Sequence, residues 1–185
     1  MLINSVPRVS PVRVAVIDSG VDAEHSGFHE QVKQQVWFRH GSSLSPLSED
    51  FHELFHGTHV AGTIHMMAPE AEIYDYRCFG AEGVGVDTAI ERSIYQAIDD
   101  GCDIINMSLG GPYANLRIQR AVRYAHWKDV IMIVAAGNEG DNDPLTNELG
   151  YVSMFFFSFN TISALHAGHL KLHHRFVLVS TAILP

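Results

Sequence analysis

The stretch Val14-Ala15-Val16-Ile17-Asp18-Ser19-Gly20 decides the fold, because an apolar run ends there in an Asp at a turn. Such a run, bounded by turn residues, is typical of a buried strand in a parallel sheet. A second stretch, His56-Gly57-Thr58-His59-Val60-Ala61-Gly62-Thr63, predicts a helix over residues 57–66. Its small residues, Gly57, Ala61 and Gly62, would let that helix pack closely on the sheet.

Short apolar runs alternate with helical patterns along the rest of the chain. We expect buried strands at Val12–Ile17, Ile73–Tyr76, Ile104–Met107 and Val130–Ala135, with a weaker fifth strand at Thr161–Ala164. This alternation is the signature of a parallel sheet covered by helices. We therefore predict an α/β fold, a three-layer doubly wound parallel sheet with flanking helices.

Two further helices are predicted from apolar spacing. The segment Ala89–Asp100 places Ile90, Ile94, Ala97 and Ile98 on one face, and the segment Leu116–Trp127 places Ile118, Ala121, Val122 and Ala125 on its inner face. Thr88 and Glu91 fit a capping box for the first of these helices, and Gly101 supplies its stop.

Composition bounds the class of protein. A chain of 185 residues with 46% apolar residues fits one domain with a real core. The net charge of −9 argues against nucleic acid or an anionic membrane as a partner, and no apolar run approaches the 18 residues of a membrane span. Cys78 and Cys102 lie at the edges of predicted strands, so we expect buried thiols rather than a disulfide.

The N-terminal segment Met1–Pro11 lacks the charged region and apolar core of a signal peptide. Localisation is therefore unknown from the sequence, with the cytoplasm as the default expectation.

Candidate functional residues follow several of the predicted strands. Asp18, the segment Ser108–Gly111 and Asn138 each come directly after a strand, and His56 opens a helix. In an open parallel sheet the functional groups lie beyond the carboxyl ends of the strands. We expect these residues to converge on one rim of the sheet.

Two more blocks complete a pattern, Asn106-Met107-Ser108-Leu109-Gly110-Gly111 and Ala135-Ala136-Gly137-Asn138-Glu139-Gly140. The four blocks, in this order, resemble the subtilisin-like serine proteases (subtilases), from about Val12 to about Leu165. The resemblance implies that residues 12–165 form a partial peptidase domain, C-terminally incomplete, and that residues 166–185 are a divergent C-terminal tail.

The resemblance also implies a role for each matching residue. His56 corresponds to the general base, and Asp18 to the carboxylate that fixes its tautomer. Asn138 corresponds to the side-chain donor of the oxyanion hole. The substrate would be a peptide or protein, paired in extended form with a strand edge made of Ser108, Leu109, Gly110 and Gly111.

The family's fifth block, Gly-Thr-Ser-Met-Ala around the nucleophilic Ser, does not occur in the 185 residues. Three explanations are open: a truncated or misread gene product, a fragment completed by a C-terminal segment of another chain, or a non-catalytic homologue that binds peptides. We expect the chain in this form to have no measurable peptidase activity.

Metal binding is a rival interpretation of part of the pattern. His52-Glu53-Leu54-Phe55-His56 matches the zinc-protease signature, which needs both His residues on one face of a continuous helix. Gly57 and the loop-like segment upstream argue against that helix, so we predict no metal ligands there. A patch of His166, His169, His173 and His174 is expected to be a solvated tail.

No cofactor is expected with certainty, and calcium stays open because the family often binds it in surface loops. The segment Met66–Glu72 is too brief for the calcium loop that many relatives insert there. Asp141-Asn142-Asp143 is rich in oxygen but lacks the ligand spacing of a dedicated site.

Overall fold

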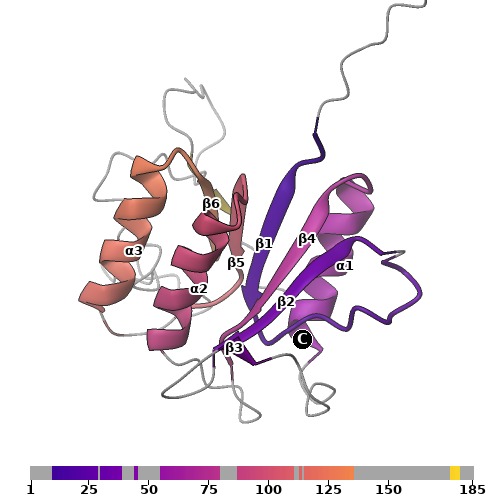
Figure 1. Cartoon of the computed structure of the whole chain (residues 1–185), viewed down its shortest axis with the longest axis horizontal. Helices are drawn as coiled ribbons and strands as arrows, with labels where there is room; N and C mark the ends of the chain where they lie inside the picture. The colour runs from indigo at the N-terminus through magenta and orange to yellow at the C-terminus, as the bar shows by residue number, and fades with distance from the viewer. Residues whose placement is uncertain are drawn as a thin grey trace, which may run out of the picture.

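The computed structural model describes residues 10–28, 30–38, 44–45, 55–79, 87–110, 113, 115–135 and 176–179. Within these ranges seven strands form one sheet in the order β3-β2-β4-β1-β5-β6-β7 (Figure 1). The strands are β1 (Arg13–Asp18), β2 (Val32–Phe38), β3 (Leu44–Ser45), β4 (Glu72–Arg77), β5 (Ile104–Met107), β6 (Ile131–Ala135) and β7 (Phe176–Val179). All neighbouring pairs are parallel except β2 with β3.

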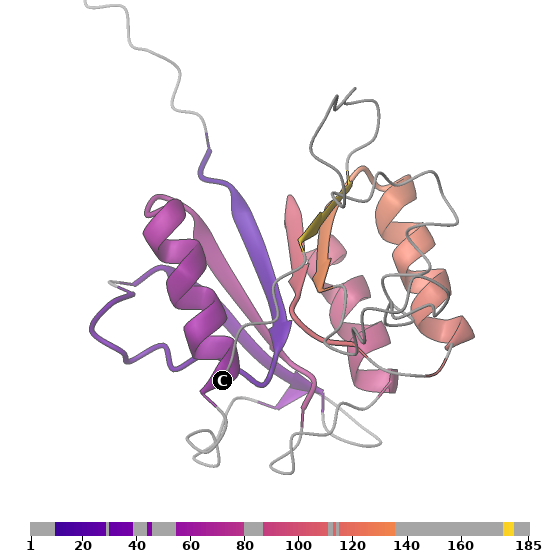
Figure 2. The same cartoon turned by 180° about the vertical axis from the view of Figure 1, so that it is seen from behind.

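Three helices cover the two faces of the sheet. Helix α1 (His56–Met67) lies on one face, and α2 (Asp87–Asp99) and α3 (Leu116–Trp127) lie side by side on the other (Figures 1 and 2). Successive side chains of β1 point to opposite faces of the sheet and so contribute to the cores on both faces. Ala15 and Ile17 join the core beneath α2 and α3, whereas Val16 joins the core beneath α1. The predicted three-layer α/β architecture is confirmed.

The four main predicted strands are confirmed, each with bounds within one residue of the prediction. Strands β2 and β3 were not predicted, because the sequence Val-Lys-Gln-Gln-Val-Trp-Phe of β2 has no long apolar run. Strand β7 was not predicted either, and it lies within residues 176–179 of the expected tail, paired with β6. The weaker strand expected at Thr161–Ala164 lies outside the described residues.

The predicted helices are confirmed, with one correction at a cap. Helix α3 has the predicted bounds and buries the four predicted residues. Helix α2 begins at Asp87, two residues earlier than expected, so Thr88 lies inside the first turn and the capping box placed there is wrong. Beyond its end, Gly101 adopts a φ of 73°, the left-handed conformation that glycine tolerates best.

The two cysteines are free and buried, as predicted. Burial raises the pKa of the Cys78 thiol well above its usual range and that of Cys102 to about 12, so both are protonated near neutrality. None of the helices in the described part of the chain has the length and apolarity to cross a membrane.

Candidate active site

Asp18 and His56 meet where β1 ends and α1 begins. Asp18 is the last residue of β1 and is buried, with 1% of its surface exposed. His56 is the first residue of α1, and its Nδ1 lies 2.8 Å from Oδ1 of Asp18. The hydrogen bond expected between these two side chains is therefore present.

The contact alters the protonation of His56. The hydrogen bond to Asp18 raises the pKa of the imidazole above 6.5, and partial burial opposes this rise. The imidazole is only half-buried, so one side of the ring stays open to a partner while the carboxylate holds the other. This arrangement can take up a proton and stabilise the resulting charge.

The turn that follows Asp18 is tied to α1 by hydrogen bonds. The N–H of Ser19 donates to Oδ1 of Asp18 at 2.6 Å. The hydroxyl oxygen of Ser19 accepts the N–H of Gly57 at 3.0 Å, and the hydroxyl of Thr58 accepts the N–H of Asp22 at 2.9 Å. Both acceptors satisfy backbone N–H groups, one of them at the open end of the helix. The turn and the helix thus hold each other in register.

Gly57 permits this close approach, and Gly62 does not contribute to it. A Cβ added at Gly57 would lie 2.3 Å from the carbonyl oxygen of Gly20 and 3.1 Å from the Cβ of Asp18. The role predicted for Gly57 is confirmed, and Ala61 is also fully buried. The same role for Gly62 is wrong, because nothing lies within 4 Å of a Cβ added there.

The segment after β5 lies beside Asp18. Strand β5 pairs with β1, with Asn106 opposite Val16, so Ser108 reaches the same rim as Asp18. The side-chain amide of Asn106 donates to the hydroxyl of Ser108 at 3.1 Å. Leu109 buries its side chain in the core, so only its backbone could contact a ligand. Gly110 is exposed and has open space around it.

Two predicted site residues, Asn138 and Gly111, lie outside the described residues. The rim therefore brings together Asp18, His56 and Ser108–Gly110.

The zinc-protease interpretation of His52–His56 is inconsistent with the backbone. Phe55 has a φ of 39°, in the left-handed region, and α1 begins only at His56. A regular right-handed helix does not continue through a residue in that conformation, whereas the zinc-protease signature needs one continuous helix up to His56; His52 itself lies outside the described residues. The connection from α1 to β4 covers only residues 68–71, so this segment is as short as the sequence indicates. Residues 141–143 and the four C-terminal His residues of the patch lie outside the described residues.

Two polar residues near the site were missed in the sequence. Asp75, in the middle of β4, is fully buried, and it contacts Gln35 of β2 and the backbone of Val21. Burial raises the pKa of Asp75 to about 7, and the charge of Asp18 adds to this rise. An Asp inside the apolar strand Ile73–Tyr76 was the available signal.

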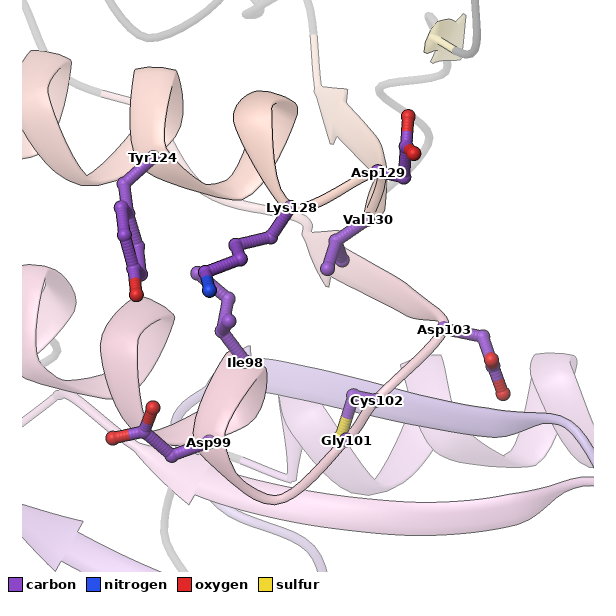
Figure 3. A pocket seen from close by; sticks show the side chains of 9 residues that line it. All are labelled: Ile98, Asp99, Gly101, Cys102, Asp103, Tyr124, Lys128, Asp129 and Val130. Atoms are coloured by element: carbon purple, nitrogen blue, oxygen red, sulfur yellow. The ribbon is translucent and has the colours of Figure 1, made fainter.

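A cavity of about 440 Å³ lies away from this rim (Figure 3). Its lining comes from the ends of α2 and α3 and from the residues that precede β5 and β6, including Asp99, Asp103, Lys128 and Asp129. Those positions are at the amino ends of the strands, so the cavity opens at the edge opposite Asp18 and His56.

Comparison with known proteins identifies the family of this chain. Residues 10–164 match the model of the subtilase family. The chain is 38% identical over 150 residues to an intracellular serine protease of Paenibacillus polymyxa, covering 76% of this chain and 45% of that protein. It is 36% identical over 156 residues to the major intracellular serine protease of Bacillus subtilis (strain 168), covering 78% of this chain and 48% of that protein.

A solved structure also matches, described as a crystal structure of a lanthipeptide protease. The TM-score is 0.58 at 30% identity, over 70% of this chain and 40% of that one. The chain thus spans about half or less of the length of these relatives. The family match covers more than half of the chain. The chain belongs to the subtilase family.

Proposed function

We propose that this protein contributes to a subtilisin-like serine endopeptidase, with His56 as general base and Asp18 as the carboxylate that orients it. The observation that carries the proposal is the 2.8 Å hydrogen bond between His56 Nδ1 and Asp18 at the carboxyl rim of a parallel sheet. A half-buried imidazole held on one side by a buried carboxylate is the arrangement that activates a hydroxyl nucleophile.

The proton moves in two steps in this scheme. A Ser hydroxyl attacks the carbonyl carbon of the scissile peptide bond while His56 accepts the hydroxyl proton at Nε2. When the tetrahedral intermediate collapses, His56 returns that proton to the leaving amine. Asp18 would stabilise the imidazolium that forms, which is consistent with the raised pKa of His56. Asn138 would donate a hydrogen bond to the oxyanion.

The substrate would be an extended peptide or protein segment. The backbone of Ser108–Gly110 follows β5 directly and lies beside Asp18, and Gly110 has open space around it. These features support pairing of a peptide with this edge by β-augmentation. Because the side chain of Leu109 is buried, the pairing would use main-chain groups.

The nucleophile has to come from a segment that carries the Gly-Thr-Ser-Met-Ala block, which these 185 residues do not contain. We expect that supplying this segment from a relative, fused or in trans, restores Ser-dependent hydrolysis and labelling by a fluorophosphonate probe. The folded state of the complemented protein is checked first by circular dichroism, because a sheet edge needs its neighbour.

Two variants and a matched control make the test specific. His56→Ala should reduce hydrolysis to background, and Asn138→Ala should lower the rate by about 10²–10³-fold, a magnitude that comes from subtilisin itself. The control is His59→Ala, which changes an exposed His one turn along the same helix and should leave the rate unchanged. A folded, complemented protein that neither hydrolyses peptides nor reacts with the probe would overturn the proposal and favour a peptide-binding module.

A further inference from the structure

The turn after Asp18 is also held from the side of the sheet. Oδ2 of Asp75 accepts the N–H of Val21 at 3.0 Å and the side-chain amide of Gln35 at 3.1 Å. The same amide nitrogen of Gln35 donates to the carbonyl oxygen of Val21 at 2.7 Å. Both backbone polar groups of Val21 are therefore bound by a bridge from β4 and β2.

Because Val21 is fully buried, water cannot easily replace the hydrogen bonds that this bridge makes to its backbone. A buried N–H or carbonyl that loses its partner costs about 1–3 kcal/mol. Val21 lies three residues beyond Asp18, and the next residue, Asp22, is bound by Thr58 of α1. The turn is thus clamped between the sheet on one side and the helix that carries His56 on the other.

We propose that Asp75, acting with Gln35, is a positioning residue for the Asp18–His56 pair, because it fixes the turn 19–22 so that the carboxylate meets the imidazole. This proposal rests on the proposed function only in that it treats the Asp18–His56 pair as catalytic. The side chains that join the turn to α1, Ser19 and Thr58, belong to the Asp-Ser-Gly and His-Gly-Thr blocks. Asp75 and Gln35 belong to neither block.

The geometry allows this clamp to work in both protonation states of Asp75. Oδ2 makes both hydrogen bonds, and Oδ1 has no hydrogen-bond partner among the described residues. A proton can therefore reside on Oδ1 while Oδ2 keeps its two donors. The charged groups that act on Asp75 are Asp18 on β1 and Arg77 on β4, and its neighbour on β2 is the neutral Gln35.

The experiment observes the pair directly in the full 185-residue chain by NMR. The readouts are the low-field resonance of the proton between His56 Nδ1 and Asp18, and the pKa of His56 from its ring carbon shifts. In Asp75→Ala we expect the low-field resonance to broaden or disappear and the pKa of His56 to fall toward 6.5. Gln35→Met, at a half-buried position, should do the same to a smaller extent.

Two further variants separate positioning from general loss of stability. Asp75→Asn keeps an acceptor oxygen for Val21 and should retain the resonance, which is rescue by the conservative change. Ile94→Ala truncates a fully buried residue of α2 on the opposite face and should leave the resonance unchanged.

The readout decides the matter without any measurement of hydrolysis, so this proposal can fail while the proposed function stands. An unchanged resonance and pKa in Gln35→Met and in a folded Asp75→Ala would overturn it. If Asp75→Ala does not fold, an unchanged Gln35→Met alone would do so. Equal loss of the resonance in Ile94→Ala would also overturn it, because a general loosening would then explain the effect.

Discussion

The face of the sheet beneath α2 and α3 holds a large apolar core, whereas the face beneath α1 holds a small core and most of the buried polar groups. In the described part of the chain, 21 buried residues form the first core and five form the second. Five of the six buried polar residues lie on the α1 side or at its rim: Asp18, Ser19, Gln31, Asp75 and Arg77. The sixth, Ser93, lies in α2.

This difference separates stability from chemistry. Apolar burial contributes roughly 25 cal/mol per Å², so the larger core carries most of the stabilisation. Buried polar groups cost stability unless they are paired, and they persist where function needs a fixed geometry. On the α1 face, the buried polar groups around Asp18 and His56 therefore lower the stability of the fold but fix the geometry of the pair. Four predictions test this contrast, in order of decreasing effect.

Removing the buried charge at Asp75 should stabilise the protein at high pH. Its folded pKa is about 7, raised by burial from 3.8, so the folded state favours the neutral acid and loses stability as pH rises from about 4 to 7. Asp75→Asn cannot ionise. We expect it to be more stable than the parent by about 4 kcal/mol at pH 8 and by less than about 1 kcal/mol at pH 4. Urea unfolding at both pH values measures this, and a difference independent of pH would contradict it.

Truncating the large core should cost stability without disturbing the site. Ile94 of α2 is fully buried, and Ile94→Ala removes buried methyl groups and leaves a cavity. We expect the free energy of unfolding to fall by about 3 kcal/mol while the pKa of His56 stays at its parent value. Chemical denaturation and NMR titration measure the two quantities. A shift in the pKa of His56 would show that the two faces are coupled.

Two glycines of α1 should respond in opposite directions to the same change. In Gly57→Ala the new methyl group meets backbone at Gly20, so we expect a loss of about 2 kcal/mol and a weaker Asp18–His56 contact. The matched change Gly62→Ala has open space and should gain up to about 1 kcal/mol from helix propensity. Thermal unfolding of both variants tests the pair, and equal losses would refute the close approach at Gly57.

The smallest effect on stability is expected from the pair itself. Asp18 raises the pKa of His56 in the folded protein. The contact between the two side chains therefore stabilises the fold below pH 6.5, and this stabilisation is lost as pH rises through the higher folded pKa of His56. His56 is half-exposed, and solvent screens the interaction. In Asp18→Asn we expect the pKa of His56 to fall toward 6.5 and the free energy of unfolding at pH 5 to change by about 1 kcal/mol or less. NMR titration measures the pKa of His56, and an unchanged value would show that Asp18 does not control the protonation of His56.

Local patterns predicted much of this fold because they report directly on burial. Helix α3 was predicted with its bounds, since the spacing of Ile118, Ala121, Val122 and Ala125 marks one face. Strand β2 was missed because the consecutive polar residues Lys33, Gln34 and Gln35 interrupt its apolar residues, and its role depends on pairing with β4. The start of α2 was misplaced because capping depends on backbone geometry that residue types do not fix.

The sequence by itself determined the fold class, the family and the identity of the Asp18–His56 pair, because apolar runs and short blocks are local signals. Only the tertiary structure decided which small residue of α1 is needed and which polar residues hold the turn. The close approach of Gly57 to Gly20 joins residues 37 apart, and the bond from Val21 to Asp75 joins residues 54 apart. Such contacts arise when parallel strands and their helix come together, and no local spacing encodes them.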